Sequence, residues 1–223
     1  MYVMVTHCQS GDGQYVEAMT DNQTIEAPAR GPAEHAVRDQ IIEAANDCFA
    51  RYGFQKTTVS DLAKSIGFSK AYIYRFFESK QAIGEAICRS RLDIIVQRTR
   101  EAMEGASGAN DRYRRMFKAI TASSVELFFV DRKIYEVASL AASEDWESAQ
   151  AYTQTLLSMI EDVVRGGRES GEFERKTPLD ETCRSIFYAM SPFVNPIFLE
   201  RNLSLVPDGQ GEVANLILRS LAP

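Results

Sequence analysis

Five residues between positions 70 and 75 have the types and spacing that suit contact with a polyanion such as DNA. At about 100° per residue, Ala71 and Arg75 share one face of a helix, with Tyr72 and Tyr74 flanking it. Lys70 stands near the start of the same helix. Arginine can pair with guanine, and a small residue lets a helix approach the base edges closely. This face therefore predicts a helix that enters a groove of DNA.

Two short helices joined by a tight turn are expected to position this face. Thr58 can cap the first helix, and Asp61 three residues later completes a capping-box pattern. Gly67 can end that helix because glycine tolerates a positive φ, and Ser69 can cap the second. This arrangement is a helix-turn-helix, whose second helix lies in the major groove. The apolar residues of each helix share one side: Val59, Leu62, Ala63 and Ile66 in the first, and Ile73, Phe76 and Phe77 in the second.

The same stretch resembles the N-terminal DNA-binding domain of TetR-type transcriptional regulators. With unbroken spacing, the resemblance is carried by Thr58, Leu62, Ala63, Gly67, Phe68, Ser69, Lys70, Ile73, Tyr74, Phe76, Phe77, Ser79 and Lys80. It extends to a preceding helix, expected over residues 34–52, through Ile42, Ala45, Phe49, Gly53 and Phe54.

The resemblance implies a role for each residue of the motif. Phosphate contacts position the protein on DNA, and contacts to base edges specify the sequence. Many family members have a glycine near Ala71 and a threonine or alanine near Tyr72. The bulky Tyr72 is a departure from that pattern, so the family's operators are not carried over. The expected DNA-binding set is Thr58, Tyr74 and Lys80 at phosphates, Ala71, Tyr72 and Arg75 at base edges, and Ser69 and Lys70 beside them.

The chain divides into three parts, and the predicted fold class is all-α. Residues 1–32 are polar and lack periodicity, so we expect a disordered or loosely attached tail, and Met19 is an alternative natural start. Residues 33–80 form the expected helix-turn-helix domain. Residues 81–223 form a helical body for effector binding and dimerisation. Its first helix, over residues 80–104 and capped by Ser79, is the expected connector.

Charge is distributed unevenly along the chain, whose formal net charge is −6. Residues 30–100 carry 12 Lys and Arg against 8 Asp and Glu, whereas residues 101–223 carry 13 against 19. A weakly basic segment beside an acidic body is typical of a DNA-binding domain joined to a separate sensing domain.

The body carries several signals for the starts and ends of helices. Asn110 or Asp111 is expected to cap a helix that runs to about residue 130, and Asp131 to cap the next. A long helix is expected over about residues 146–169.

Prolines mark the last part of the body. Thr177 and Pro178 are a favourable N-cap and first-residue pair. Pro192 and Pro196 are expected to kink or break the helix that follows.

In TetR-type regulators the body is a dimeric ligand-sensing domain, and its last two long helices pair with their counterparts in a four-helix bundle. By position, those helices are the segments near residues 178–200 and 208–221. An apolar stripe on a final helix needs a cover, which is either a second copy or the rest of its own subunit. We expect a homodimer, because two-fold pairing presents two recognition helices to the DNA.

Large side chains in the body indicate a site for a small molecule. A helix broken by Pro192 and Pro196 packs less well, and a cavity can open there, although most of the aromatic residues are expected to be ordinary core. Few charges accompany these residues, so we expect an apolar or aromatic effector. The expected lining is Trp146, Tyr152, Phe187 and Met190.

Catalysis is poorly supported by the residues present. The two histidines, His7 and His35, lie before the body, which leaves no partner there for a nucleophilic Ser or Cys. Neighbouring acids such as Glu144 and Asp145 point about 100° apart on a helix, which is typical of solvated charge. A carboxylate-based hydrolase is the least favoured alternative, and we expect no catalytic residue and no cofactor.

The remaining composition limits location and partners. Four scattered cysteines without metal-ligand spacing are typical of a reduced, cytoplasmic protein without a metal site. No run of 18 apolar residues is present, so we expect no membrane partner.

The predicted function is that of a ligand-responsive regulator, by family default a repressor, which binds a palindrome in double-stranded DNA and is released by a small molecule. The alternative, an architectural DNA-binding protein without an effector, has weak sequence specificity.

Overall fold

The computed structural model describes residues 32–223, in which every regular element is a helix and no strand occurs. The first four helices are α1 (Pro32–Tyr52), α2 (Val59–Ile66), α3 (Lys70–Tyr74) and α4 (Lys80–Met103). The next three are α5 (Ala109–Val130), α6 (Arg132–Ser143) and α7 (Glu147–Ser170). The chain ends with α8 (Leu179–Val194), α9 (Pro196–Asn202), the 3₁₀ turn η1 (Leu203–Leu205) and α10 (Asp208–Ser220). The all-α fold class is confirmed. The expectations for residues 1–31, which include Met19 and His7, lie outside the described residues.

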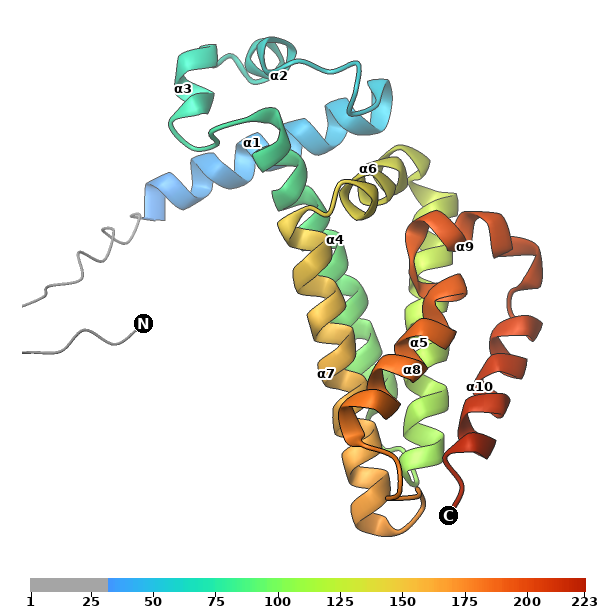
Figure 1. Cartoon of the computed structure of the whole chain (residues 1–223). Coiled ribbons are helices and arrows are strands. Elements are labelled where there is room, and N and C mark those ends of the chain that lie inside the picture. The colour runs from blue at the N-terminus through green and yellow to red at the C-terminus, as the bar shows by residue number, and fades with distance from the viewer. Residues whose placement is uncertain (1–31) are drawn as a thin grey trace, which may run out of the picture.

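The helices form a small head and a long body (Figure 1). α1, α2, α3 and the first turns of α4 make the head. α4 then runs down into the body, beside α5 and α7, with α8 and α10 completing the bundle. α6 lies between the two parts and packs on α1 of the head and on α9 of the body.

The head has its own apolar core. Ile41 and Phe49 of α1, Leu62 of α2 and Ile73 of α3 are fully buried in it. Burying a side chain of this size contributes about 1.5–3 kcal/mol. The same core also takes in residues of the body elements, namely Ile134, Val137 and Ala141 of α6 and Trp146 at the start of α7. The head is therefore packed onto the body through α6 as well as through the continuous helix α4.

Most of the expected helix starts are confirmed. The side chains of Thr58, Ser69 and Ser79 accept hydrogen bonds from backbone N–H groups in the first turns of α2, α3 and α4. Asp131 does the same for Ile134 at the start of α6. These caps involve residues three positions apart, so the local sequence is sufficient to predict them.

The predicted cap of α5 is wrong. The helix begins at Ala109, so Asn110 and Asp111 lie inside its first turn. The exposed amide groups are satisfied instead by Glu172, from the loop after α7. Its carboxylate accepts hydrogen bonds from Ala109 N at 2.8 Å, Asn110 N at 3.2 Å and Asn110 Nδ2 at 2.9 Å.

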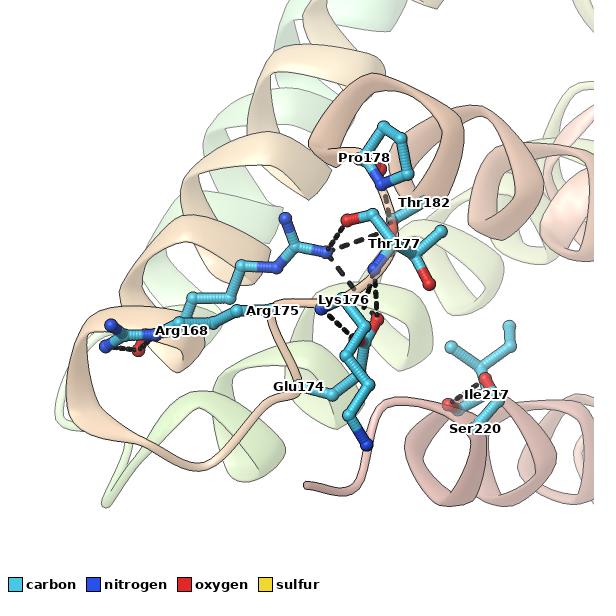
Figure 2. Close-up of polar contacts among 9 residues, drawn as sticks. All are labelled: Arg168, Glu174, Arg175, Lys176, Thr177, Pro178, Thr182, Ile217 and Ser220. Carbon is cyan, nitrogen blue, oxygen red and sulfur yellow. Dashed lines mark hydrogen bonds and ion pairs between the residues drawn. The ribbon is translucent and has the colours of Figure 1, made fainter.

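The predicted start of α8 is also wrong, by one residue. Pro178 is the N-cap, and Thr182 N donates to its carbonyl at 3.0 Å. Figure 2 shows the contacts of Thr177 with Arg168 in the last turn of α7 and with Glu174 in the loop that follows. Thr177 N donates to Glu174 at 3.2 Å, and Arg168 Nη2 donates to the Thr177 carbonyl at 2.8 Å. Arg168 and Glu174 are largely buried and form an ion pair at 3.7 Å.

The two prolines behave differently from each other. Pro192 lies inside α8, which continues to Val194. The break comes at Asn195, whose side chain caps α9 by accepting from Ile197 N at 3.0 Å. Pro196 occupies the first position of α9, where its missing N–H costs nothing.

The cap of α5 gives a prediction about the pH dependence of stability. The hydrogen bonds from Ala109 and Asn110 lower the pKa of Glu172 from 4.5 to about 2. Because the folded state favours the carboxylate, its stabilising contribution is complete above pH 4.5 and is lost as the pH falls towards 2. Glu172→Gln removes this contribution. Urea unfolding at a series of pH values is expected to show a wild-type advantage at pH 7 that shrinks between pH 4.5 and 2. A difference that stays constant over that range contradicts the assignment.

Candidate nucleic-acid interface and internal cavity

The turn between α2 and α3 fixes the direction of the second helix. Thr58 and Asp61 form the full capping box at the start of α2. Gly67 ends α2 in the left-handed conformation, with φ 72°, which suits glycine because it has no Cβ. Ser69 Oγ then accepts from Tyr72 N at 3.1 Å and starts α3. The helix-turn-helix predicted from the sequence is present, although α3 is only five residues long.

The outer face of α3 carries the expected residues. Ala71, Tyr74 and Arg75 are exposed, and Lys70 at the start of the helix is exposed with them. The Lys70 ammonium lies 5.7 Å from the centre of the Tyr74 ring. The opposite face is buried through Ile73 and, just after the helix, Phe77. A small residue, a phenol and two cations are thus presented together to the solvent.

Tyr72 lies differently from the expectation that it faces outward with Ala71. It is half-buried in a row of aromatic rings, 5.0 Å from Phe68 and 5.4 Å from Phe76, both edge to face. The Arg75 guanidinium lies 5.5 Å from the centre of the Tyr72 ring. Tyr72 therefore supports Arg75 from the side, by a cation–π contact.

The hydroxyl of Thr58 and the ammonium of Lys80 already have protein partners. Thr58 Oγ1 donates to Asp61 at 2.6 Å within the capping box. Lys80 Nζ donates to the Phe54 carbonyl at 2.9 Å and lies 4.4 Å from the centre of the Phe54 ring. Burial lowers the pKa of Lys80. The phosphate contacts expected of both residues stay predictions.

A contact that the sequence analysis missed joins the head to the body. α4 passes so close to Phe54 and Trp146 that a Cβ at Gly84 would lie 2.9 Å from Phe54 Cε2 and 3.1 Å from Trp146 Cζ3. The Phe54 and Trp146 rings meet edge to face at 5.6 Å, and Trp146 Nε1 donates to Glu144 at 2.9 Å. We name Phe54, Gly84 and Trp146 the joint. An isolated glycine in a helix is the signal that could have revealed it, because such a glycine often has a packing reason.

The body contains an apolar cavity of about 80 Å³ beside the break between α8 and α9. Tyr152 and Phe187 line it, as expected. Trp146 belongs to the joint, and Met190 is fully buried in the core of the body, so neither lines the cavity. The lining is Cys88, Leu92, Ile95, Ser124, Leu127, Tyr135, Ala138, Ala141, Ala142, Ala149, Tyr152, Thr153, Leu156, Phe187, Val194, Asn195 and Pro196.

None of the side chains that line this cavity is charged. Desolvation and the neighbouring Glu85 raise the pKa of the Cys88 thiol to about 12, so the thiol stays protonated and unreactive at neutral pH. The described residues include no cluster of His, Cys, Asp and Glu able to hold a metal ion, and none of their helices is long and apolar enough to cross a membrane.

Comparison with known proteins identifies the family. Residues 41–87 match the family model of bacterial regulatory proteins of the tetR family, and residues 109–204 match that of a Tetracyclin repressor-like C-terminal domain. The two segments together make up more than half of the chain and coincide with the head and most of the body. The chain therefore belongs to the TetR family of transcriptional regulators.

Individual relatives agree with this assignment. The HTH-type transcriptional repressor KstR2 of Mycobacterium tuberculosis is 26% identical over 151 residues, which cover 67% of this chain and 75% of the repressor. The HTH-type transcriptional regulator YhgD of Bacillus subtilis is 27% identical over 138 residues, 62% of this chain and 72% of that protein. The fatty acid degradation regulator FadR of Bacillus halodurans has the same fold, with a TM-score of 0.61 at 21% identity, over 85% of this chain and 96% of that one.

The two lysines at the interface are expected to differ in their effect on stability. Lys80→Ala should lower the free energy of unfolding by about 1 kcal/mol, because the Phe54 carbonyl loses a charged donor. Lys70→Ala is the matched control and should stay within about 0.5 kcal/mol of wild type, because its side chain is exposed. Urea unfolding followed by circular dichroism measures both. Equal stability of the two variants would show that the Lys80–Phe54 contact contributes nothing.

Proposed function

We propose that this protein is a repressor that binds a palindromic DNA operator as a homodimer and leaves it when a small apolar or aromatic molecule enters the body. The observation that carries the proposal is the outer face of α3, where Lys70, Ala71, Tyr74 and Arg75 are exposed together on a capped helix-turn-helix. A face of this composition suits the major groove, because it combines phosphate partners with a base-reading guanidinium.

The role of each side chain follows from its surroundings. Arg75 reads guanine, held at the required angle by the ring of Tyr72. Ala71 allows close approach of the helix to the bases. Tyr74 and Lys70 contact phosphates. When DNA is bound, Thr58 and Lys80 also contact phosphates, either in addition to their present hydrogen bonds to Asp61 and the Phe54 carbonyl or in place of them.

The dimer is proposed to form through α8 and α10. Each of these helices buries one side in the body, through Ile186 and Met190 in α8 and Ile217 and Leu218 in α10. Each also exposes a large apolar side chain on its other side, Tyr188 at 67% and Leu216 at 65%. Pairing with a second copy covers both, and the two-fold symmetry of the dimer then matches the symmetry of a palindrome.

The cavity is proposed to communicate with the head through two elements. Cys88, Leu92 and Ile95 of α4 line it, and Gly84 of the joint lies on the same helix, one turn before Cys88. Tyr135 of α6 lines it too, and its hydroxyl donates to the Pro196 carbonyl at 2.7 Å, while the neighbouring Ile134 lies in the core of the head. A ligand that displaces these residues moves the recognition helices, and such couplings are worth about 1–3 kcal/mol. The presence of this apolar cavity supports a ligand-responsive regulator over an architectural protein.

Selection of bound DNA from a random pool tests the proposal directly. Wild-type protein is expected to enrich two inverted half-sites. Arg75→Ala should relax the preference at one position in each half-site, at a cost of about 1–3 kcal/mol if the contact to guanine is bidentate. Arg112→Ala, an exposed arginine in the body, is the matched control and should select the same palindrome as wild type.

Two results would count against these assignments. Enrichment without symmetry would favour the architectural alternative. An equal loss of affinity for selected and random DNA in Arg75→Ala would remove the base-reading role from Arg75 and leave it a phosphate contact.

The dimer surface can be tested without DNA. Leu216→Glu places a charge in the proposed interface, where its desolvation opposes pairing, so the protein should become monomeric at micromolar concentration. Phe129→Glu is the control, because Phe129 is 70% exposed but lies at the end of α5. Analytical ultracentrifugation measures both, and circular dichroism confirms that the variants are folded. A dimeric Leu216→Glu protein would place the interface elsewhere.

A further inference from the structure

The polar groups in the lining of the cavity are few, and they differ in whether they already have partners. Asn195 accepts a hydrogen bond from Ile197 N as the cap of α9, and Tyr135 donates to the Pro196 carbonyl. These two groups are committed to holding the break between α8 and α9. Tyr152, which projects from α7, has no such partner.

The hydroxyl oxygen of Tyr152 is buried, with less than 1 Å² exposed, and no described residue forms a hydrogen bond to it. An unpaired hydroxyl in an apolar setting is costly, and most buried polar groups in proteins are satisfied. Desolvation raises the pKa of this phenol, so the group stays neutral and can both donate and accept a hydrogen bond. A second hydroxyl, that of Ser124 on α5, belongs to a residue of the same lining that is 7% exposed.

We propose that the effector is a neutral, mainly apolar molecule with one hydroxyl or carbonyl oxygen, and that this oxygen pairs with the Tyr152 hydroxyl. The inference rests on the proposed function, because it takes the cavity to be the effector site. It adds the chemical class of the ligand and the residue that selects it. Tyr152 is the specificity-determining residue, and Ser124 supplies a second hydroxyl to the same site.

Two other classes of ligand fit the cavity less well. A pure hydrocarbon fills the space but leaves the Tyr152 hydroxyl without a partner. A carboxylate loses its hydration in a lining that contains no cation to replace it, which is costly. A neutral ligand with a single oxygen avoids both penalties.

The size of the cavity guides the choice of probes. At about 80 Å³ it is smaller than an engineered apolar cavity of about 150 Å³ that takes up benzene, so a single ring is the largest suitable probe and enters only if a wall residue moves. Phenol, toluene and benzoate have similar size and differ in one substituent: a neutral hydroxyl, a methyl group and a carboxylate. Phe187 is only half-buried at the cavity wall and can turn to admit a ring.

The experiment is a titration of the full-length protein with each of the three probes, followed by ligand-detected NMR. Wild type is expected to bind phenol about threefold to tenfold more tightly than toluene, the range that one hydrogen bond provides. Benzoate should bind more weakly than either. Tyr152→Phe, which removes only the hydroxyl, should bind phenol and toluene equally.

Tyr113→Phe is the matched control. Tyr113 is a fully buried tyrosine whose hydroxyl also lacks a partner, but it belongs to the core of the body and does not line the cavity. This variant should keep the wild-type preference for phenol. Thermal unfolding of both variants without ligand shows that they are folded.

Several outcomes overturn the inference. They are equal binding of phenol and toluene by wild type, a preference for phenol that survives in Tyr152→Phe, tightest binding by benzoate, or no binding of any probe. Release of selected operator DNA by phenol is measured separately and tests the proposed function. Preference for phenol through Tyr152 without release of DNA would uphold the ligand class and remove the effector role. Equal release of DNA by toluene and phenol would uphold the effector role of the cavity and remove the proposed ligand class.

Discussion

The contact on which the rest of the structure depends is the joint of Phe54, Gly84 and Trp146. α4 is continuous from the head into the body, so a rigid connection already exists along one line. A single helix leaves the head free to tilt and to rotate about its axis. The packing of the Phe54 and Trp146 rings over Gly84, with α6 in the same apolar core, adds further points of contact and removes that freedom. In the proposed mechanism, this packing is what carries a change in the body to α3 as a change in its position.

The cavity is placed where it can act on both connections. Its walls include residues of α4 and α6, and these are the elements that meet the core of the head. The break between α8 and α9 forms another wall, and the Tyr135 hydroxyl ties this break to α6. A ligand bound there, as proposed above, would contact both α4 and α6. Cores are close-packed, so a displacement of this kind is transmitted to neighbouring elements.

Much of the head could be predicted from the sequence, because its determinants are local. The capping box of Thr58 and Asp61, the left-handed Gly67 and the cap of Ser69 depend on residues within three positions of one another. Errors arose where a distant side chain decides the outcome. Glu172 caps α5 from across the body, and Arg168, nine positions earlier in α7, donates to the carbonyl of Thr177 before α8. Trp146 and Met190 have the type expected of a cavity wall, but only the packing of α4, α6 and α8 determines which side chains surround the space. A helical wheel places Tyr72 beside Ala71 and shows no contact with Phe68, which precedes α3, so the aromatic row became visible only in three dimensions. The expected contact of Tyr72 with base edges stays a prediction.

The cap of α5 by Glu172 also bears on the order in which the chain acquires its structure during synthesis. α5 begins at residue 109, and the carboxylate that satisfies its first amide groups lies 63 residues further along the chain. While the ribosome is still making α6 and α7, the start of α5 has only water as a partner. The bundle of α4, α5 and α7 is therefore completed at both ends only when the loop after α7 emerges. At that point the four helices of the head have already been synthesised, because they precede α5 in the chain.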